Sequence, residues 1–375
     1  MRRRHVLQAA AAAATATPLF VRAQESNEIT VAQISPFTVL PAPDAKELFE
    51  GAQAAFDEIN GKGGVGGRKV NLLKYDDAYS YDGFKARLAE AMARKPLALF
   101  SPIGSGTLKQ MLDNKVLDTT DVIVLNAIPG AAVIREPGHP KLFHVRAGDE
   151  QQIRKIVAHA QALNIRSLVV LYQNIPMGSS GLASAQAAAQ GTDLKVSGAQ
   201  SSPAVADLEK AAGNLVESNP HAALVIGAPK FMGQAVAALR AAGMSQQIFS
   251  LSYLPAPALK ALAGAGARGV GIAQTFPNPN GVTLPLQRAF RASMQRTHQD
   301  LKTYTPFHLE GYLTAQVFTE AARKSRALTP TALGESLHRM GELDLGGFRV
   351  DFSKGNEGSH WVDIGVATAD GRLIY

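Results

Sequence analysis

Two adjacent carboxylates, Asp76 and Asp77, are the first residues in this sequence whose types and spacing could do chemistry. They follow residues 70–75, a short apolar stretch that predicts a buried strand. In open parallel sheets, ligands bind beyond the carboxyl ends of the strands. An acidic pair at that place could act as a general acid and base or hold a divalent cation.

Ser105 is a candidate for anion binding. It stands between Gly104 and Gly106, after an apolar stretch at 97–100 and before a helical pattern at 108–116. A serine hydroxyl and the free N–H groups at a helix start suit an anion. Serine is also a common helix N-cap, so Ser105 is predicted to contact a ligand, to cap the helix, or to do both.

Other signatures of catalysis are missing from the sequence. The chain has no cysteine, which excludes thiol nucleophiles and cysteine–metal sites. Its nine histidines show no HExxH or other close metal spacing, and no GxSxG or P-loop occurs. Residues 61–66 fit GxGxxG, but they follow a helical pattern and precede a strand, the reverse of the dinucleotide-binding order. We therefore expect neither an enzyme nor a metal or organic cofactor.

The elements that position these residues alternate between strand and helix. Residues 49–81 combine apolar positions at helical spacing, a glycine-rich turn and a strand. A strand is predicted at 142–146, and the strand–helix rhythm restarts after it. This pattern predicts an α/β fold with two parallel-type sheets, and 375 residues are enough for two domains.

The first 23 residues have the composition of an export signal. Three arginines at 2–4 precede an alanine-rich apolar stretch, and residues 21–23 resemble a cleavage site. We expect cleavage near Ala23 and a periplasmic protein. The arginines fit a twin-arginine signal as well as an ordinary secretory signal.

The charge balance argues against a nucleic-acid partner. Removing residues 1–23 takes away four arginines and no acids, so the formal charge falls from +7 to +3. No Lys/Arg cluster of the kind that follows a phosphate backbone is present in the remaining sequence. No later stretch approaches the ~18 consecutive apolar residues of a transmembrane helix.

Six segments carry a more specific pattern: GAQAAFDEINGKGGVGGRKVNLLKYDDA (51–78), GSGT (104–107), LFHVRAGDEQQ (142–152), MGQAVAALRAAGM (232–244), EGYLTAQVFTEA (310–321) and GGFRVDFSKGN (346–356). Together they resemble, in register over nearly all of the mature chain, the leucine/isoleucine/valine-binding family of type I periplasmic binding proteins. Members of this family deliver solutes to ABC transporters.

The resemblance implies two Rossmann-like lobes joined by a three-strand hinge, with ligand trapped as the lobes close. Mapped onto this chain, lobe 1 covers 27–146 plus 277–343, and lobe 2 covers 147–276 plus 344–375. In this family the loop that holds Asp76 and Asp77 is structural and lies near the rim of lobe 1.

In lobe 1, the resemblance places the ligand carboxylate at two loops. Ser105, with Gly104 before it, matches the family position that supplies hydroxyl and backbone donors. The next family loop corresponds to residues 127–130, where backbone groups at Ile128 and Gly130 complete the site. The family usually has a threonine where this chain has Gly130, so one side-chain donor is lost.

In lobe 2, the sequence departs further from the family. Met177 stands where a tyrosine usually packs on the ligand, and it is either an apolar wall or an ordinary loop residue. Amino-acid binders place an acid at the position of Phe231, and Lys230 precedes it. A buried ammonium without a counter-charge costs several kcal/mol, so a free branched-chain amino acid is a poor ligand unless another acid compensates. Phe231, Tyr253 and Phe276 are predicted either to line an apolar pocket or to belong to the core.

These expectations favour a monomeric transport receptor that binds a small organic ligand, such as a carboxylate, and hands it to an inner-membrane ABC permease. The alternative is a ligand-sensing module of the same fold that reports to a signalling partner.

Overall fold

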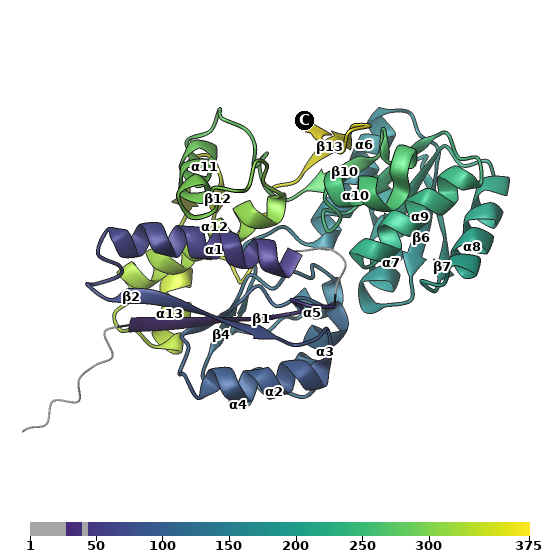
Figure 1. Cartoon of the computed structure of the whole chain (residues 1–375). Helices are drawn as coiled ribbons and strands as arrows, with labels where there is room; N and C mark the ends of the chain where they lie inside the picture. Colours follow the sequence, from purple (N-terminus) through teal and green to yellow (C-terminus); the bar gives the residue numbers. More distant parts are fainter. Residues whose placement is uncertain (1–27, 40–43) are drawn as a thin grey trace, which may run out of the picture.

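The computed structural model describes residues 28–39 and 44–375 (Figure 1). The predicted signal peptide, residues 1–23, and the predicted start of lobe 1 at residue 27 lie outside the described residues. Figure 1 shows two separate sheets, each with its own helices, so the described chain forms two lobes.

The first lobe contains a sheet of five parallel strands in the order β2-β1-β3-β4-β5. They are β1 (Glu28–Ser35), β2 (Lys69–Asp76), β3 (Ala98–Phe100), β4 (Ile123–Leu125) and β5 (Leu142–Phe143). Ser35 pairs with Asp76, so the carboxyl ends of β1 and β2 meet at one edge. Ser101 and Asn126 follow β3 and β4 at this edge with φ of 46° and 64°. Loops at this edge can reach a ligand.

Helices pack around this sheet in two groups (Figure 1). One group is α1 (Asp44–Gly61), α11 (Pro285–Thr297), α12 (Pro306–Lys324) and α13 (Pro330–Arg339). The other is α2 (Tyr81–Met92), α3 (Ser105–Asp113), α4 (Val116–Thr119) and α5 (Ala132–Arg135). The first lobe therefore takes its last three helices from residues 285–339, a part of the chain that lies between strands of the second sheet.

The end of α1 shows how local chemistry sets these elements. Phe56 and Ile59 are buried on one face of the helix, and α1 ends at Gly61. The Asn60 side chain exchanges two hydrogen bonds with the Val70 backbone (2.7 and 2.9 Å), which fixes β2 against the helix end. In the turn between them, Gly64 has φ of 73°, and a Cβ there would lie 2.1 Å from a carbonyl oxygen. Only glycine fits this close approach.

The second lobe contains a seven-stranded sheet in the order β14-β13-β10-β9-β8-β6-β7. Its strands are β6 (Ser167–Gln173), β7 (Lys195–Ser201), β8 (Ala222–Ile226), β9 (Gln247–Ser250), β10 (Gly271–Gln274), β13 (Asp363–Ala367) and β14 (Leu373–Ile374). Strands β6 to β10 are parallel, whereas β13 and β14 pair antiparallel. Its helical elements are α6 (Asp149–Ala162), α7 (Pro176–Ala189), α8 (Val205–Glu217), α9 (Pro229–Ala241), α10 (Ala256–Ala263) and η1 (Gly264–Ala267).

The chain crosses between the lobes three times: after β5, after β10, and between β12 (Arg349–Val350) and β13. β12 forms a small hairpin with β11 (Leu343–Asp344). Parallel-dominated sheets in two α/β lobes confirm the predicted fold class. The proposed boundaries of the lobes stay a prediction, and Phe348 and Phe352 pack into the same hydrophobic cluster as α1 and α12.

The structure corrects three local expectations. The helix predicted at 108–116 begins at Ser105 and ends at Asp113. The strand predicted at 142–146 ends at Phe143, because the N–H groups of Val145 and Arg146 turn to the Asn126 side chain instead of a neighbouring strand. Helix α10 was not predicted from the sequence.

Candidate ligand-binding site

Arg146 and Glu310 form a buried ion pair where the first crossover leaves the first lobe. Both side chains are 1% exposed, and Arg146 Nη1 lies 3.3 Å from Glu310 Oε2. Asn126 Nδ2 donates to Glu310 Oε1 (2.9 Å), and Arg146 Nη2 donates to the Ser252 hydroxyl. Burial raises the pKa of Glu310, while the Arg146 guanidinium and the Asn126 bond oppose the rise. Because buried charges are tolerated only when paired, these contacts fix the crossover in one geometry.

Tyr253 joins the two lobes at the same place. The Gly130 N–H donates to the Tyr253 hydroxyl (2.8 Å), and that hydroxyl donates to Asp149 Oδ1. The Asp149 N–H in turn donates to the Gly130 carbonyl (2.9 Å). The Arg146 guanidinium lies over the Tyr253 ring, 4.7 Å from its centroid. We call Asn126, Arg146, Asp149, Tyr253 and Glu310 the crossover network.

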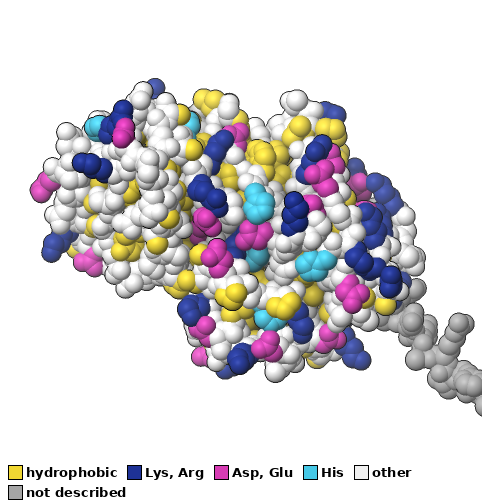
Figure 2. All heavy atoms as spheres, turned by 180° about the vertical axis from the view of Figure 1, so that it is seen from behind, with side chains coloured by type: hydrophobic (Ala, Val, Ile, Leu, Met, Phe, Trp, Pro, Cys, Tyr) yellow, Lys and Arg dark blue, Asp and Glu magenta, His cyan; other side chains and the backbone are white. Residues whose placement is uncertain are grey.

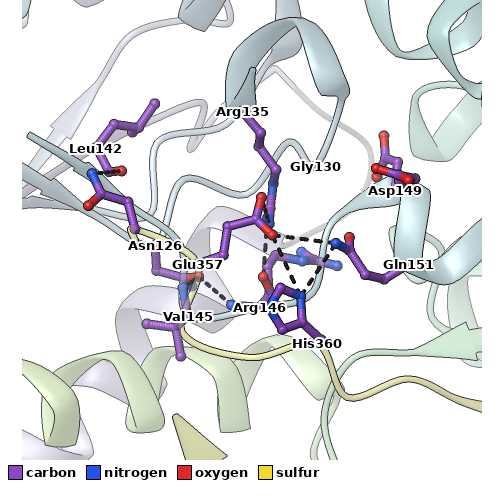
Figure 3. Close-up of polar contacts among 12 residues, drawn as sticks. Asn126, Gly130, Arg135, Leu142, Val145, Arg146, Asp149, Gln151, Glu357 and His360 are labelled. Atoms are coloured by element: carbon purple, nitrogen blue, oxygen red, sulfur yellow. Dashed lines mark hydrogen bonds and ion pairs between the residues drawn. The ribbon is translucent and has the colours of Figure 1, made fainter. Parts of the chain in front are cut away.

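Figure 3 shows a second set of polar contacts beside this network. The Arg135 side chain points toward Glu357, with Arg135 Nη1 3.2 Å from Glu357 Oε1. Gln151 Nε2 donates to Glu357 Oε2 (3.4 Å), and His360 Nδ1 lies 3.7 Å from that oxygen. Arg135 Nη2 also donates to the Arg146 carbonyl (3.2 Å). The first and third crossovers are thus held together by charge as well as by packing.

The acidic pair Asp76 and Asp77 holds a loop together. Asp76 accepts hydrogen bonds from the Phe37 N–H (2.9 Å) and the Thr38 hydroxyl (2.5 Å). Asp77 is buried and accepts from the Tyr79 N–H (2.8 Å), and burial raises its pKa to about 6. Both carboxylates hold neighbouring backbone in place. Within residues 28–39 and 44–375, no three His, Asp or Glu side chains gather to hold a metal.

A cleft of ≈ 480 Å³ opens between the two lobes. We call it the interlobe cleft; its lining residues are Thr38, Val39, Gln173, Pro203, Ala228, Lys230 and Phe231. Thr38 and Val39 follow β1 in the first lobe, and the other five belong to the end of β6, to loops and to the start of α9 in the second lobe. The volume is in the range of about 300–1,000 Å³ that small-molecule sites occupy.

Internal hydrogen bonds shape both walls of the interlobe cleft. On the first-lobe wall, Asp76 holds Thr38. On the second-lobe wall, Gln173 Oε1 accepts the Ala228 N–H (2.8 Å), which ties the end of β6 to the start of α9. Phe231 is 1% exposed and anchors the base of that wall in the core.

Ser105 lies at the start of α3 and is buried. The N-cap of α3 is Gly104, which has no side chain, so the capping role expected as an alternative for Ser105 is wrong. Gly104 has φ of 104°, and a Cβ there would lie 3.1 Å from the Tyr79 ring. Helix α3 contacts α7 of the second lobe, so Ser105 stands on a helix at the junction of the lobes.

The backbone donors of the next loop already have partners. The Ile128 N–H donates to the Pro102 carbonyl (3.1 Å), and the Gly130 N–H donates to Tyr253. A Cβ at Gly130 would lie 2.6 Å from Asp149 Oδ1, so no side chain fits there. The structure therefore does not leave these two N–H groups free for a carboxylate.

The four predicted residues of the second lobe separate into different places. Phe231 lines the interlobe cleft. Met177 is buried at the start of α7, and Tyr253 belongs to the crossover network. Phe276 is fully buried and packs on Phe348, with ring centroids 5.1 Å apart.

Thr38, Val39 and Gln173 were not predicted as site residues. Two of them have a signal in the sequence: Thr38 and Gln173 stand at or just after the carboxyl ends of predicted strands, where ligands bind. The signal was not specific, because every strand of a parallel sheet offers such an end.

Two α/β lobes, three crossovers and a cleft with walls from both lobes define a two-lobed binding protein. The chain belongs to the periplasmic binding protein family, which matches residues 28–372. Membership confirms the prediction of a binding protein rather than an enzyme and implies an extracytoplasmic location. No helix in the described part of the chain has the length and apolar character needed to cross a membrane.

Solved structures agree with this family. An extracellular ligand-binding receptor from Verminephrobacter eiseniae ef01-2 is 46% identical, with a TM-score of 0.90 over 93% of this chain and 100% of that chain. A substrate-binding periplasmic protein from Ralstonia solanacearum is 25% identical, with a TM-score of 0.82 over 92% and 99%. No curated protein sequence matches the chain.

Proposed function

We propose that this protein is the solute-binding component of an ABC transporter of the leucine/isoleucine/valine-binding type. It is exported, cleaved near Ala23, binds a small organic acid between its lobes as a monomer, and passes the acid to an inner-membrane permease. The observation that carries this proposal is the interlobe cleft, which has walls from both lobes and, among the residues that the structure describes, a single charged lining residue, Lys230.

Structures that share the fold support the transport role. They include a fatty acid ABC transporter substrate-binding protein from Thermomonospora curvata, 19% identical with a TM-score of 0.78. They also include an ABC transporter substrate-binding protein from Desulfitobacterium hafniense in complex with Leu, 20% identical with a TM-score of 0.76.

The ligand we propose is an acid without an ammonium group. Among the described residues, no carboxylate lines the interlobe cleft, and the position at which amino-acid binders carry an acid is Phe231. Ser105 and the N–H groups at the start of α3 are the donors we assign to the ligand carboxylate, with Gly104 allowing close approach. Met177 and Phe231 supply apolar contact.

A thermal-shift screen over aliphatic and aromatic carboxylates, their amides, and amino acids tests this function. A ligand that binds only the folded protein raises its stability, so carboxylates should raise Tm while their amides do not. Leucine, isoleucine and valine should leave Tm unchanged. Sub-micromolar binding of any of these three amino acids would overturn the proposed ligand class.

Ser105→Ala tests the assigned donor. The variant should weaken binding of the best carboxylate by about tenfold or more, since a hydrogen bond to a charged group contributes about 1.5–3 kcal/mol. Calorimetry measures the affinity, and the Tm without ligand should stay within about one degree. Ser179→Ala, an exposed serine at the start of α7, is the matched control. Equal affinity in both variants would remove Ser105 from the site.

A further inference from the structure

The second-lobe wall of the interlobe cleft presents hydrogen-bond donors and no free acceptor side chain. Gln173 Oε1 is occupied by the Ala228 N–H (2.8 Å). Because that N–H requires an oxygen, the orientation of the Gln173 amide is fixed and its Nε2 is the group left over. Gln173 Nε2 makes no hydrogen bond within residues 28–39 and 44–375.

Lys230 adds a cation to this wall. It is exposed, lines the cleft, and has no ion pair or hydrogen bond within the described chain. Asp76 bonds to the lining residue Thr38, and it is already engaged by the Thr38 hydroxyl, the Phe37 N–H and the Ala78 N–H. Lys230 therefore has no counter-ion of its own in the cleft.

Four of the seven described lining residues of the cleft are apolar. Val39 from the first lobe and Pro203, Ala228 and Phe231 from the second lobe lie among its lining residues. These groups offer contact to a short hydrocarbon segment and nothing to a polar one. The first-lobe donor that we assign to the ligand carboxylate, Ser105, lies on α3, a helix that contacts α7 just beyond Gln173.

We propose that the ligand is a diacid: one acidic group binds at Ser105 of the first lobe and the second binds at Lys230 and Gln173 of the second lobe, with a short apolar spacer between them. This inference rests on the proposed function and deepens it. Each lobe then contributes its own anion site, so a diacid bridges the lobes and favours their closure, whereas a monoacid leaves the second-lobe donors unpaired.

Linear diacids from succinate to adipate, compared with monoacids of equal chain length, test the inference by calorimetry. The wild-type protein should bind the best diacid at least tenfold more tightly than the matching monoacid. Lys230→Gln should remove most of that preference by weakening diacid binding at least tenfold more than monoacid binding. Lys210→Gln is the matched control, because Lys210 is an exposed second-lobe lysine in a neighbouring hollow outside the interlobe cleft.

The outcomes separate the two proposals. Equal affinity for diacids and monoacids, or an equal loss of both in Lys230→Gln, would overturn the diacid assignment while leaving the proposed function in place. Failure of every acid to bind would overturn both. Small-angle scattering gives an independent reading: the best diacid should reduce the radius of gyration of the wild-type protein, and Lys230→Gln should abolish that reduction at the same concentration.

Discussion

Arg146 and Lys230 are both cations at the junction of the two lobes, and their surroundings differ in every respect. Arg146 is 1% exposed, paired with Glu310, and stacked over Tyr253. Lys230 is exposed and lines the interlobe cleft without a partner among the described residues. Figure 2, which views the molecule from behind, shows acidic and basic side chains interspersed over the surface on that face and no large region of one sign.

The difference separates two tasks. A buried charge that lost its partner would destabilise the fold, so the crossover network is internally paired and its geometry is fixed. An exposed charge costs little when it is unpaired, so Lys230 is free to meet a ligand. The polar groups that join the lobes bond to one another, whereas Lys230 in the interlobe cleft has no partner within the described residues.

Arg146→Met should have the largest effect. It leaves Glu310 buried without a cation, which typically destabilises a protein by about 3–5 kcal/mol. Equilibrium unfolding in urea at pH 7 measures the loss. Lys230→Met is the control and should change the free energy of unfolding by less than about 0.5 kcal/mol. Equal losses in the two variants would erase the distinction between the crossover network and the cleft.

Asp44 makes the stability of the folded protein depend on pH. It starts α1 and is 3% exposed, and burial raises its pKa from 3.8 to about 7, with Glu47 and Glu310 adding to the rise. The folded state therefore favours neutral Asp44. The stabilisation is complete below about pH 4 and is lost as the pH rises toward 7.

Asp44→Asn should accordingly gain stability over the wild type as the pH rises from 5 to 8. The gain should reach roughly 2–4 kcal/mol, since one pKa unit corresponds to about 1.4 kcal/mol. Urea unfolding at both pH values measures it. A difference between the two proteins that stays flat with pH would show that Asp44 titrates normally.

Tyr253→Phe should have the smallest effect of the three. It removes the hydrogen bonds to Gly130 and Asp149 while the ring stays in place, which costs about 1–3 kcal/mol. The Gly130 amide should exchange hydrogen faster in the variant. Tyr172→Phe is the control, because the half-buried Tyr172 side chain makes no hydrogen bond within the described residues. Unchanged exchange at Gly130 would argue against an inter-lobe bond in solution.

The sequence was sufficient for the fold because its signals are local and repeated. Helical spacing along α1, the glycine turn and the apolar strands each specify their own element, and their alternation specifies parallel sheets. The predicted boundaries of helices and strands were wrong where a tertiary contact ends the element. β5 ends at Phe143 because the His144 N–H donates to the Asn356 carbonyl and the N–H groups of Val145 and Arg146 donate to the Asn126 side chain.

The candidate site was predicted only in part. Residue types alone allowed Ser105 to cap α3, but the backbone makes Gly104 the N-cap. The Gly130 N–H looked free in the sequence, and only the fold brings Tyr253 to it across 123 positions of the chain.

The sequence by itself determined two α/β lobes and the residue types at the ends of their strands, because these follow from short-range periodicity. Only the tertiary structure decided which polar groups bond to other groups of the protein and which face the interlobe cleft. That partition depends on contacts between distant segments, such as Arg146 with Glu310, and local patterns carry no information about such pairings. Within the part of the chain that the structure describes, it leaves Lys230 and Gln173 Nε2 without partners, and the comparison of diacids with monoacids tests what they bind.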